Sequence, residues 1–175
     1  MKYPRSYIIL HHTGAEEKNA EQVRKNHLRR GWQDVGYNYI IEKDGTVVSG
    51  RSLDIPGAHC SASGMNHKSV GIALIGNFEV RSPTEKQITA LISLLKRLKE
   101  ELSIPEKNVL PHKSVPGAKT LCPGKHFPLS RILKSLDGEE KYWKVQCGAF
   151  SSRENAEQFA EKLRKMGVSC FVVEP

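Results

Sequence analysis

The feature that most constrains this chain is a pair of residues with metal-binding side chains in a loop-forming stretch. His112 and Cys122 stand ten positions apart, and Pro116 and Gly117 lie between them among small polar residues. This spacing is too wide for one helix face and too irregular for one strand, so it predicts a loop that folds back. A neutral imidazole and a thiolate are ligands that Zn²⁺ prefers. The stretch is therefore typical of part of a metal site.

A third protein ligand must come from elsewhere in the chain, and the best candidate is His11. It follows the apolar run 7–10, which predicts a buried strand. Three protein ligands with an open fourth position are typical of a catalytic zinc site rather than a structural one. The alternative is that these residues are structural, since a free cysteine is often a small buried hydrophobe. His112 and Cys122 alone do not decide between the two.

Length and composition indicate a globular protein with more than one part. The 175 residues suffice for one ordinary domain and a small appendage. Hydrophobic residues make up 38% and charged residues 26%. The four cysteines have no CxxC spacing, which argues against a disulfide framework. We expect no membrane span and no signal peptide, and therefore synthesis in the cytoplasm.

The net charge of +8 lies in the first part of the chain. From Gly138 onward six basic residues balance six acidic ones, so residues 1–137 carry the excess. A basic surface favours a polyanionic partner such as nucleic acid, a membrane surface or an anionic cell wall. The few aromatic residues are not interleaved with basic ones as stacking platforms would require, so we expect no nucleic-acid binding.

The hydrophobic pattern predicts a mixed α/β domain over residues 1–136. Alternating runs on either side of Asp44-Gly45 predict a hairpin, and Ser82-Pro83-Thr84-Glu85 predicts a capping box at a helix start. The predicted strands cover 7–10, 37–43, 46–48 and 70–75, the predicted helices 14–30, 82–102 and 127–136, and a long loop 50–69.

The last part of the chain predicts a small separate unit. We expect a linker over 137–141 and a strand-helix-strand segment over 142–175, with strands at 143–150 and 168–173 around a helix that Ser152 caps. Two strands and one helix bury little apolar surface, so this unit should be marginal alone or incomplete.

Six motifs in the first part carry a resemblance to a known family. Residues 5–135 resemble the zinc-dependent N-acetylmuramoyl-L-alanine amidases, which include phage lysozymes of the amidase class and peptidoglycan recognition proteins. The resemblance implies a central mixed sheet flanked by helices, with one zinc ion per chain in a surface groove. The motifs are Ile8-Ile-Leu-His-His-Thr13, Gly36-Tyr-Asn-Tyr-Ile-Ile-Glu-Lys-Asp-Gly45, Gly57-Ala-His59, Asn66-His-Lys-Ser-Val-Gly-Ile-Ala-Leu-Ile-Gly-Asn77, Pro111-His112 and Thr120-Leu-Cys-Pro-Gly124.

The resemblance also implies roles for single residues of the catalytic centre. His11, His112 and Cys122 correspond to the metal ligands, and Tyr37 corresponds to the catalytic tyrosine, with strand packing as its alternative role. Thr120 stands where some members have a catalytic lysine and recognition-protein amidases often have threonine, so we take it as the second catalytic residue.

Four other residues near these positions are given narrower roles. His59 and Asn66 match positions along the substrate groove, and the alternative for His59 is a loop residue that bonds the backbone. His12 is expected to be a packing or supporting group. Lys119 lies next to Thr120, and we expect its side chain to point away from the groove.

Residues 142–175 resemble the first half of a SPOR domain, a peptidoglycan-binding repeat. The matching stretches are Tyr142-Trp-Lys-Val-Gln-Cys-Gly-Ala-Phe150 and Glu154-Asn-Ala-Glu157. Because the second half is missing, the unit either pairs with another copy in a homodimer or is a poorly anchored appendage. We favour pairing.

Together these patterns predict a peptidoglycan amidase of the phage endolysin or autolysin kind. It would hydrolyse the amide between N-acetylmuramic acid and L-alanine and reach the wall through lysis, by a holin for example, or through non-classical export. The alternative is a module that recognises peptidoglycan without cutting it.

Overall fold

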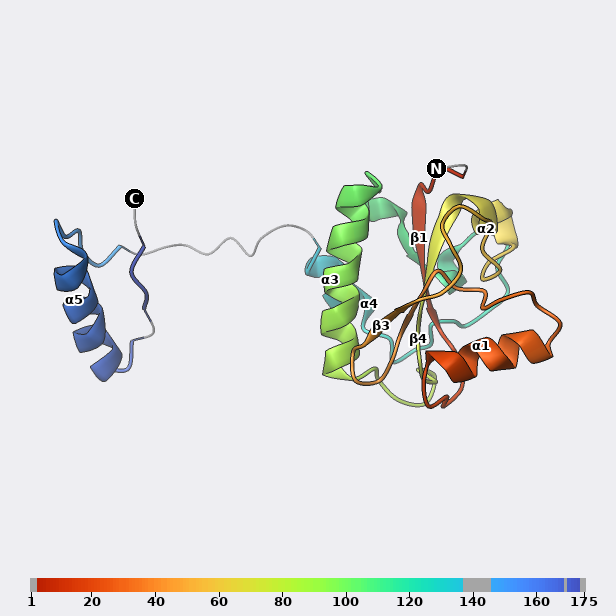
Figure 1. Cartoon of the computed structure of the whole chain (residues 1–175), viewed down its shortest axis with the longest axis horizontal. Coiled ribbons are helices and arrows are strands. Elements are labelled where there is room, and N and C mark those ends of the chain that lie inside the picture. The colour runs from red at the N-terminus through yellow and green to blue at the C-terminus, as the bar shows by residue number, and fades with distance from the viewer. Residues whose placement is uncertain (1–2, 137–145, 169, 174–175) are drawn as a thin grey trace. The chain divides into compact units, whose positions relative to one another are not determined.

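The structure is a computed structural model that describes residues 3–136, 146–168 and 170–173. The chain forms two compact units, Met1–Glu139 and Glu140–Pro175. The linker predicted over 137–141 lies outside the described residues. Figure 1 labels the main helices and strands.

The first unit is built on a five-stranded mixed sheet with the order β3-β2-β4-β1-β5. β1 pairs in parallel with β4 on one side and with β5 on the other, and β2 pairs in parallel with β4. Among the strand pairs of the described residues, β2–β3 is the antiparallel one. The strands are β1 (Tyr7–His12), β2 (Tyr39–Ile41), β3 (Val47–Ser49), β4 (Ser69–Leu74) and β5 (Val109–Pro111). With helices on both faces (Figure 1), the predicted mixed α/β class is confirmed.

The helices of this unit are α1 (Ala20–Arg29), α2 (Met65–Lys68), α3 (Glu85–Glu101) and α4 (Leu129–Lys134), with short 3₁₀ turns at η1 (Ala62–Gly64), η2 (Glu106–Asn108) and η3 (His112–Ser114). The first predicted helix starts later than expected, because the Asn19 side chain accepts a hydrogen bond from Gln22 N and caps α1 there. The predicted loop over 50–69 was partly wrong, since η1 and α2 lie within it. None of the helices that the structure describes could cross a membrane.

The predicted hairpin around Asp44-Gly45 is confirmed. β2 and β3 pair with Ile40 opposite Val48. The Asp44 carboxylate accepts a hydrogen bond from Thr46 N at 2.9 Å, and Gly45 has φ +90°, a conformation that costs glycine little. The local turn chemistry therefore sets this edge of the sheet.

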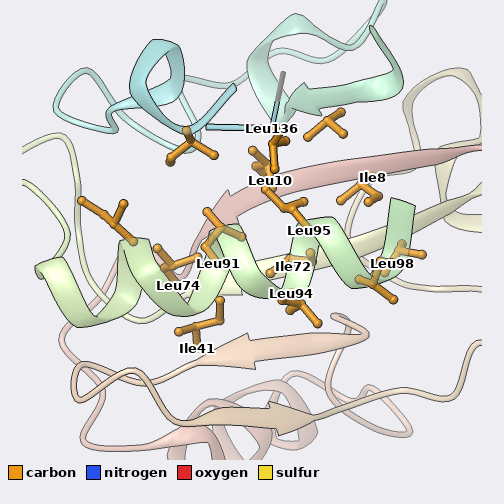
Figure 2. Close-up of a cluster of buried hydrophobic side chains, with 14 of the residues drawn as sticks. Ile8, Leu10, Ile41, Ile72, Leu74, Leu91, Leu94, Leu95, Leu98 and Leu136 are labelled. Carbon is orange, nitrogen blue, oxygen red and sulfur yellow. The ribbon is translucent and has the colours of Figure 1, made fainter. Parts of the chain in front are cut away.

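Alternate residues of the central strands face α3 and form the main core. Figure 2 shows the leucines of α3 lying against the sheet beneath them. Burying each such side chain stabilises the fold by about 1.5–3 kcal/mol, so the position of the sheet relative to α3 is firmly held. The fully buried members include Ile8, Leu10, Ile41, Val70, Ile72, Leu74, Leu91, Leu95 and Leu98.

The capping box of α3 lies two residues later than the predicted box that began at Ser82. Thr84 is the N-cap, and its side chain and that of Gln87 each accept a hydrogen bond from the other's backbone N–H. The Gln87 amide also donates to the carbonyls of Ile41 and Ile75 at 3.2 and 3.0 Å. This buried glutamine ties the helix start to the sheet, which explains the shift.

The opposite face of the sheet carries smaller and more polar residues. Ile9 and His11 of β1 point to this side, in register with Gly71 and Ala73 of β4. The two small residues of β4 leave space above the sheet beside His11. The candidate site described below fills that space.

The described residues of the second unit contain the predicted helix but not the predicted strands. α5 (Arg153–Lys165) begins after the N-cap Ser152. Residues 146–150, 168 and 170–173 form no strand, and the rest of the two predicted strands lies outside the described residues. A strand needs a neighbour for its backbone groups, and the described residues of this segment pair with no neighbouring strand. Phe150 and Phe171 are accordingly 44% and 74% exposed.

Candidate metal centre and groove

Two of the three predicted metal ligands lie side by side because of strand register. Leu10 of β1 pairs with Pro111 of β5 in parallel, so His11 and His112 follow at the same edge of the sheet. Their ring centroids are 4.6 Å apart. Residues 11 and 112, distant in sequence, thus meet through the parallel pairing of β1 with β5.

Cys122 reaches the same point from the loop after η3. Lys113 N donates to the Cys122 carbonyl at 2.8 Å, which closes the loop between His112 and Cys122. Cys122 Sγ lies 3.6 Å from His11 Nδ1. The ligand atoms of His11, His112 and Cys122 all lie within 4.8 Å of one another, a spacing that fits one metal ion.

The chemistry of these three side chains fits a metal ion. Burial lowers the pKa of His11 well below its ordinary value and also lowers that of His112, so both rings are neutral and offer lone pairs at pH 7. Burial raises the pKa of Cys122 to about 12. A thiolate therefore forms there only beside a strong positive charge, and a coordinated metal ion supplies one.

The nitrogen of His11 that faces away from Cys122 has its own partner. His11 Nε2 lies 3.0 Å from His59 Nδ1, and the two rings meet edge to face. Burial lowers the pKa of His59 to about 3, and the nearby His112 makes the second-largest contribution to this shift. His59 is thus a neutral, buried histidine that contacts a candidate ligand.

His12, the neighbour of His11, turns to the other side of the sheet. Its Nδ1 accepts a hydrogen bond from Phe78 N at 3.0 Å, and its ring lies 5.9 Å from the Phe78 ring. Phe78 belongs to the core under α3. The expected packing role of His12 agrees with these contacts.

Tyr37 lies just before β2, with its ring 5.3 Å from that of His11. The residue is partly exposed, and burial of its hydroxyl, with Cys122 nearby, raises its pKa above the ordinary value of 10. The neutral phenol can donate a hydrogen bond to a group held at the centre. Tyr37 therefore has the place and the chemistry of a hydrogen-bond donor.

A groove of about 600 Å³ opens beside His112. Its walls come from the segment 58–66 on one side and the loop 117–120 on the other. The predicted residues Thr120, His59 and Asn66 are among the lining residues, which are Trp32, Ala58, His59, Cys60, Ser61, Ala62, Asn66, His112, Gly117, Ala118, Lys119 and Thr120. Lys119 also lines it, against our expectation, because neighbouring residues of a loop need not alternate as they do in a strand.

Thr120 and Asn66 both bond the backbone as well as facing the groove. Thr120 Oγ1 accepts from Cys122 N at 3.1 Å, so its own proton can be donated into the groove. Asn66 Oδ1 accepts from the backbone N–H groups of His59 and Cys60 at 2.9 and 2.8 Å. Asn66 therefore shapes the wall of the groove, and a contact with substrate stays a prediction for its remaining amide protons.

One residue that supports the site carries no sequence signal. The Arg5 guanidinium is 4% exposed and donates to the backbone carbonyls of Leu53, Ile55, Asn66 and Ser69 at 2.6 to 3.3 Å. It thereby fastens both ends of the segment that forms one groove wall. A single arginine outside any motif gave no reason to expect this.

Comparisons with known proteins agree with this geometry. The sequence profile of a family described as N-acetylmuramoyl-L-alanine amidase matches residues 1–125, and the profile of the SPOR domain matches residues 130–174. The SPOR match begins within α4, although Ile132 of α4 is buried in the core of the first unit. The residues of α4 that the SPOR profile matches therefore belong to the first unit in the structure.

Relatives from animals and phages share the first unit. A peptidoglycan-recognition protein of Drosophila simulans is 33% identical over 136 residues, which cover 71% of each chain. The endolysin of Enterobacteria phage K11 is 34% identical over 133 residues, 71% of this chain and 83% of the endolysin. The solved structure of N-acetylmuramoyl-L-alanine amidase LysC from Clostridium intestinale URNW has a TM-score of 0.71 and 34% identity, covering 79% of this chain and 89% of LysC.

Proposed function

The chain belongs to the N-acetylmuramoyl-L-alanine amidase family, and from this premise we propose that it hydrolyses the amide between N-acetylmuramic acid and L-alanine in peptidoglycan, using one zinc ion per chain. The observation that carries the proposal is the convergence of His11, His112 and Cys122 beside an open groove. Two imidazoles and one thiolate leave a fourth position free, as catalytic zinc sites do.

Zinc would be held by His11 Nδ1, Cys122 Sγ and a ring nitrogen of His112. When bound, zinc lowers the pKa of a water ligand and polarises the carbonyl of the scissile amide. The chain's own residues would bind the glycopeptide in the groove and keep its scissile carbonyl carbon beside His112.

Two hydroxyls, those of Tyr37 and Thr120, would assist the reaction. Tyr37 donates to the negative charge that develops on the carbonyl oxygen, since its neutral phenol is a donor and a poor base at pH 7. Thr120 can add a second donor because its oxygen already accepts from Cys122 N. Asn66 and the rim of the groove would orient the sugar and the peptide.

Recognition of peptidoglycan without cleavage is the second candidate function. It has support from the relatives that are named peptidoglycan-recognition proteins. The presence of Cys122 together with both histidines favours catalysis, because a module that only binds its ligand needs no complete metal site.

We expect the purified chain to bind about one zinc ion and to release free L-alanine amino termini from purified peptidoglycan. Cys122→Ser should lose zinc and product together, because serine is a poor zinc ligand. Metal content by mass spectrometry and amine release by end-group analysis measure both quantities. Cys147→Ser, at an exposed cysteine of the second unit, serves as the control.

Zinc retained at full occupancy in Cys122→Ser would remove Cys122 from the site. New reducing sugar ends in place of alanine amino termini would contradict the amidase reaction itself. A chain that binds muropeptides and zinc but releases no amine would favour the recognition function.

Tyr37→Phe should keep the fold and the zinc content but lower turnover by roughly 10- to 1000-fold, the range for one donor to a transition state. Hydrolysis rates on a soluble muropeptide measure this effect, and metal content reports the integrity of the site. Tyr39→Phe, two positions later in β2, should change neither quantity. Equal rates for Tyr37→Phe and the unmodified chain would make Tyr37 a packing residue.

We further propose that residues 1–136 are the catalytic domain and residues 142–175 attach the enzyme to wall glycan. The SPOR match supports the attachment role.

The chain would act on the wall after lysis of the producing cell or after non-classical export, in line with relatives named endolysins. Exposed Phe150 and Phe171 support pairing of two such units, and a full-length chain that sediments only as a monomer would contradict that pairing.

Deletion of residues 138–175 should weaken the pull-down of the protein by intact walls and leave hydrolysis of small soluble muropeptides unchanged. The comparison is best made in Cys122→Ser chains, so that the walls are not digested during binding. The segment has no net charge, so its contribution should persist at about 1 M salt, where the Debye length is about 3 Å. Equal wall binding with and without the segment would refute the attachment role.

A further inference from the structure

We propose that His59 is a positioning residue that fixes the proton and the ring orientation of the metal ligand His11. The inference rests on the proposed zinc site and adds a role to it. It starts from the 3.0 Å contact between His59 Nδ1 and His11 Nε2. The resemblance to the family had suggested a different role for His59, along the substrate groove.

The contact has only one arrangement of protons that leaves His11 free to bind a metal. His11 Nδ1 faces Cys122 Sγ at 3.6 Å, so this nitrogen must keep its lone pair. A neutral imidazole then carries its proton on Nε2, which points at His59. His59 Nδ1 must accept that proton's hydrogen bond, and His59 in turn carries its own proton on Nε2.

The remaining nitrogen of His59 agrees with this assignment. His59 Nε2 is buried, and it is the one such side-chain atom among the described residues that has no hydrogen-bond partner. The side chain is 9% exposed, so this nitrogen does not present itself to a ligand in the groove. The backbone carbonyl of Ser69 nevertheless acts on the His59 ring so as to raise its pKa, as an acceptor close to a ring N–H does, and this agrees with a proton on the nitrogen that does not face His11.

The ring of His59 lies in a slot that two glycines leave open. A Cβ atom at Gly71 would lie 2.4 Å from Cγ and Cδ2 of His59, and one at Gly57 would lie 2.6 Å from Cδ2. Such distances are not compatible with any other residue unless the ring moves. Gly71 lies on β4, which pairs with β1, so the slot is built next to His11.

The backbone that carries His59 is also fixed. Asn66 Oδ1 accepts from the N–H groups of His59 and Cys60, and Gly57 N donates to the Asn66 carbonyl at 2.8 Å. Arg5 also donates to the same carbonyl, at 3.1 Å. With slot and backbone both fixed, His59 can set the orientation of His11 before a metal binds.

Hydrogen-bond partners of metal-binding histidines are worth about 10- to 100-fold in metal affinity. His59→Leu removes the acceptor, whereas His59→Asn places Oδ1 close to the position of Nδ1 with nearly the same shape. We expect His59→Leu to weaken zinc binding by about that factor and His59→Asn to stay within about threefold of the unmodified chain. Competition with a chromophoric chelator measures the affinity, and His67→Leu at an exposed histidine of α2 is the control.

Equal losses in the leucine and asparagine variants would overturn the inference, because they would show a packing role. Unchanged affinity in both would overturn it as well. If His59→Leu does not fold, long-range ¹H–¹⁵N correlation spectra of the unmodified full chain with zinc decide the question: a proton on His59 Nε2 supports the proposal, and a proton on Nδ1 refutes it. Failure of the unmodified chain to bind zinc would instead refute the proposed function.

Discussion

The parallel pairing of β1 between β4 and β5 is the constraint on which the candidate site depends. It places His11 beside His112, although about a hundred positions separate them in the sequence. It also sets Gly71 and Ala73 beside Ile9 and His11, which leaves space above the sheet. A slip of one residue would turn His11 into the core under α3 and bring His12 to the site, so the strand register also determines the geometry of the candidate metal site.

One face of the sheet forms the hydrophobic core, and the other face carries the candidate metal ligands. The face under α3 is packed with leucine and isoleucine and holds the strands in position. The other face buries titratable groups, whose pKa values shift so that the histidines stay neutral and the Cys122 thiol resists ionisation. The neutral histidines can offer lone pairs to a cation without losing a proton, whereas the Cys122 thiol has to lose its proton when a metal binds.

Much of the fold, and the convergence of three candidate metal ligands, could be predicted from the sequence. Periodicity predicts α3 and the hairpin at Asp44-Gly45, and residue types at family positions predict His11, His112 and Cys122. What could not be predicted depends on side-chain direction and distant backbone contacts. Arg5 bonds carbonyls about fifty to sixty positions away, and the start of α3 depends on the buried Gln87. The described residues of the second unit form no strand, and periodicity does not report whether a neighbouring strand is there to pair with.

The central claim is that one zinc ion binds to two nitrogens and one sulfur of this chain. X-ray absorption at the zinc edge of the full-length protein tests it most directly. We predict one sulfur at about 2.3 Å and two imidazole nitrogens at about 2.0–2.1 Å, with one further light ligand from solvent. A spectrum with nitrogen and oxygen neighbours and no sulfur at that distance would contradict the account.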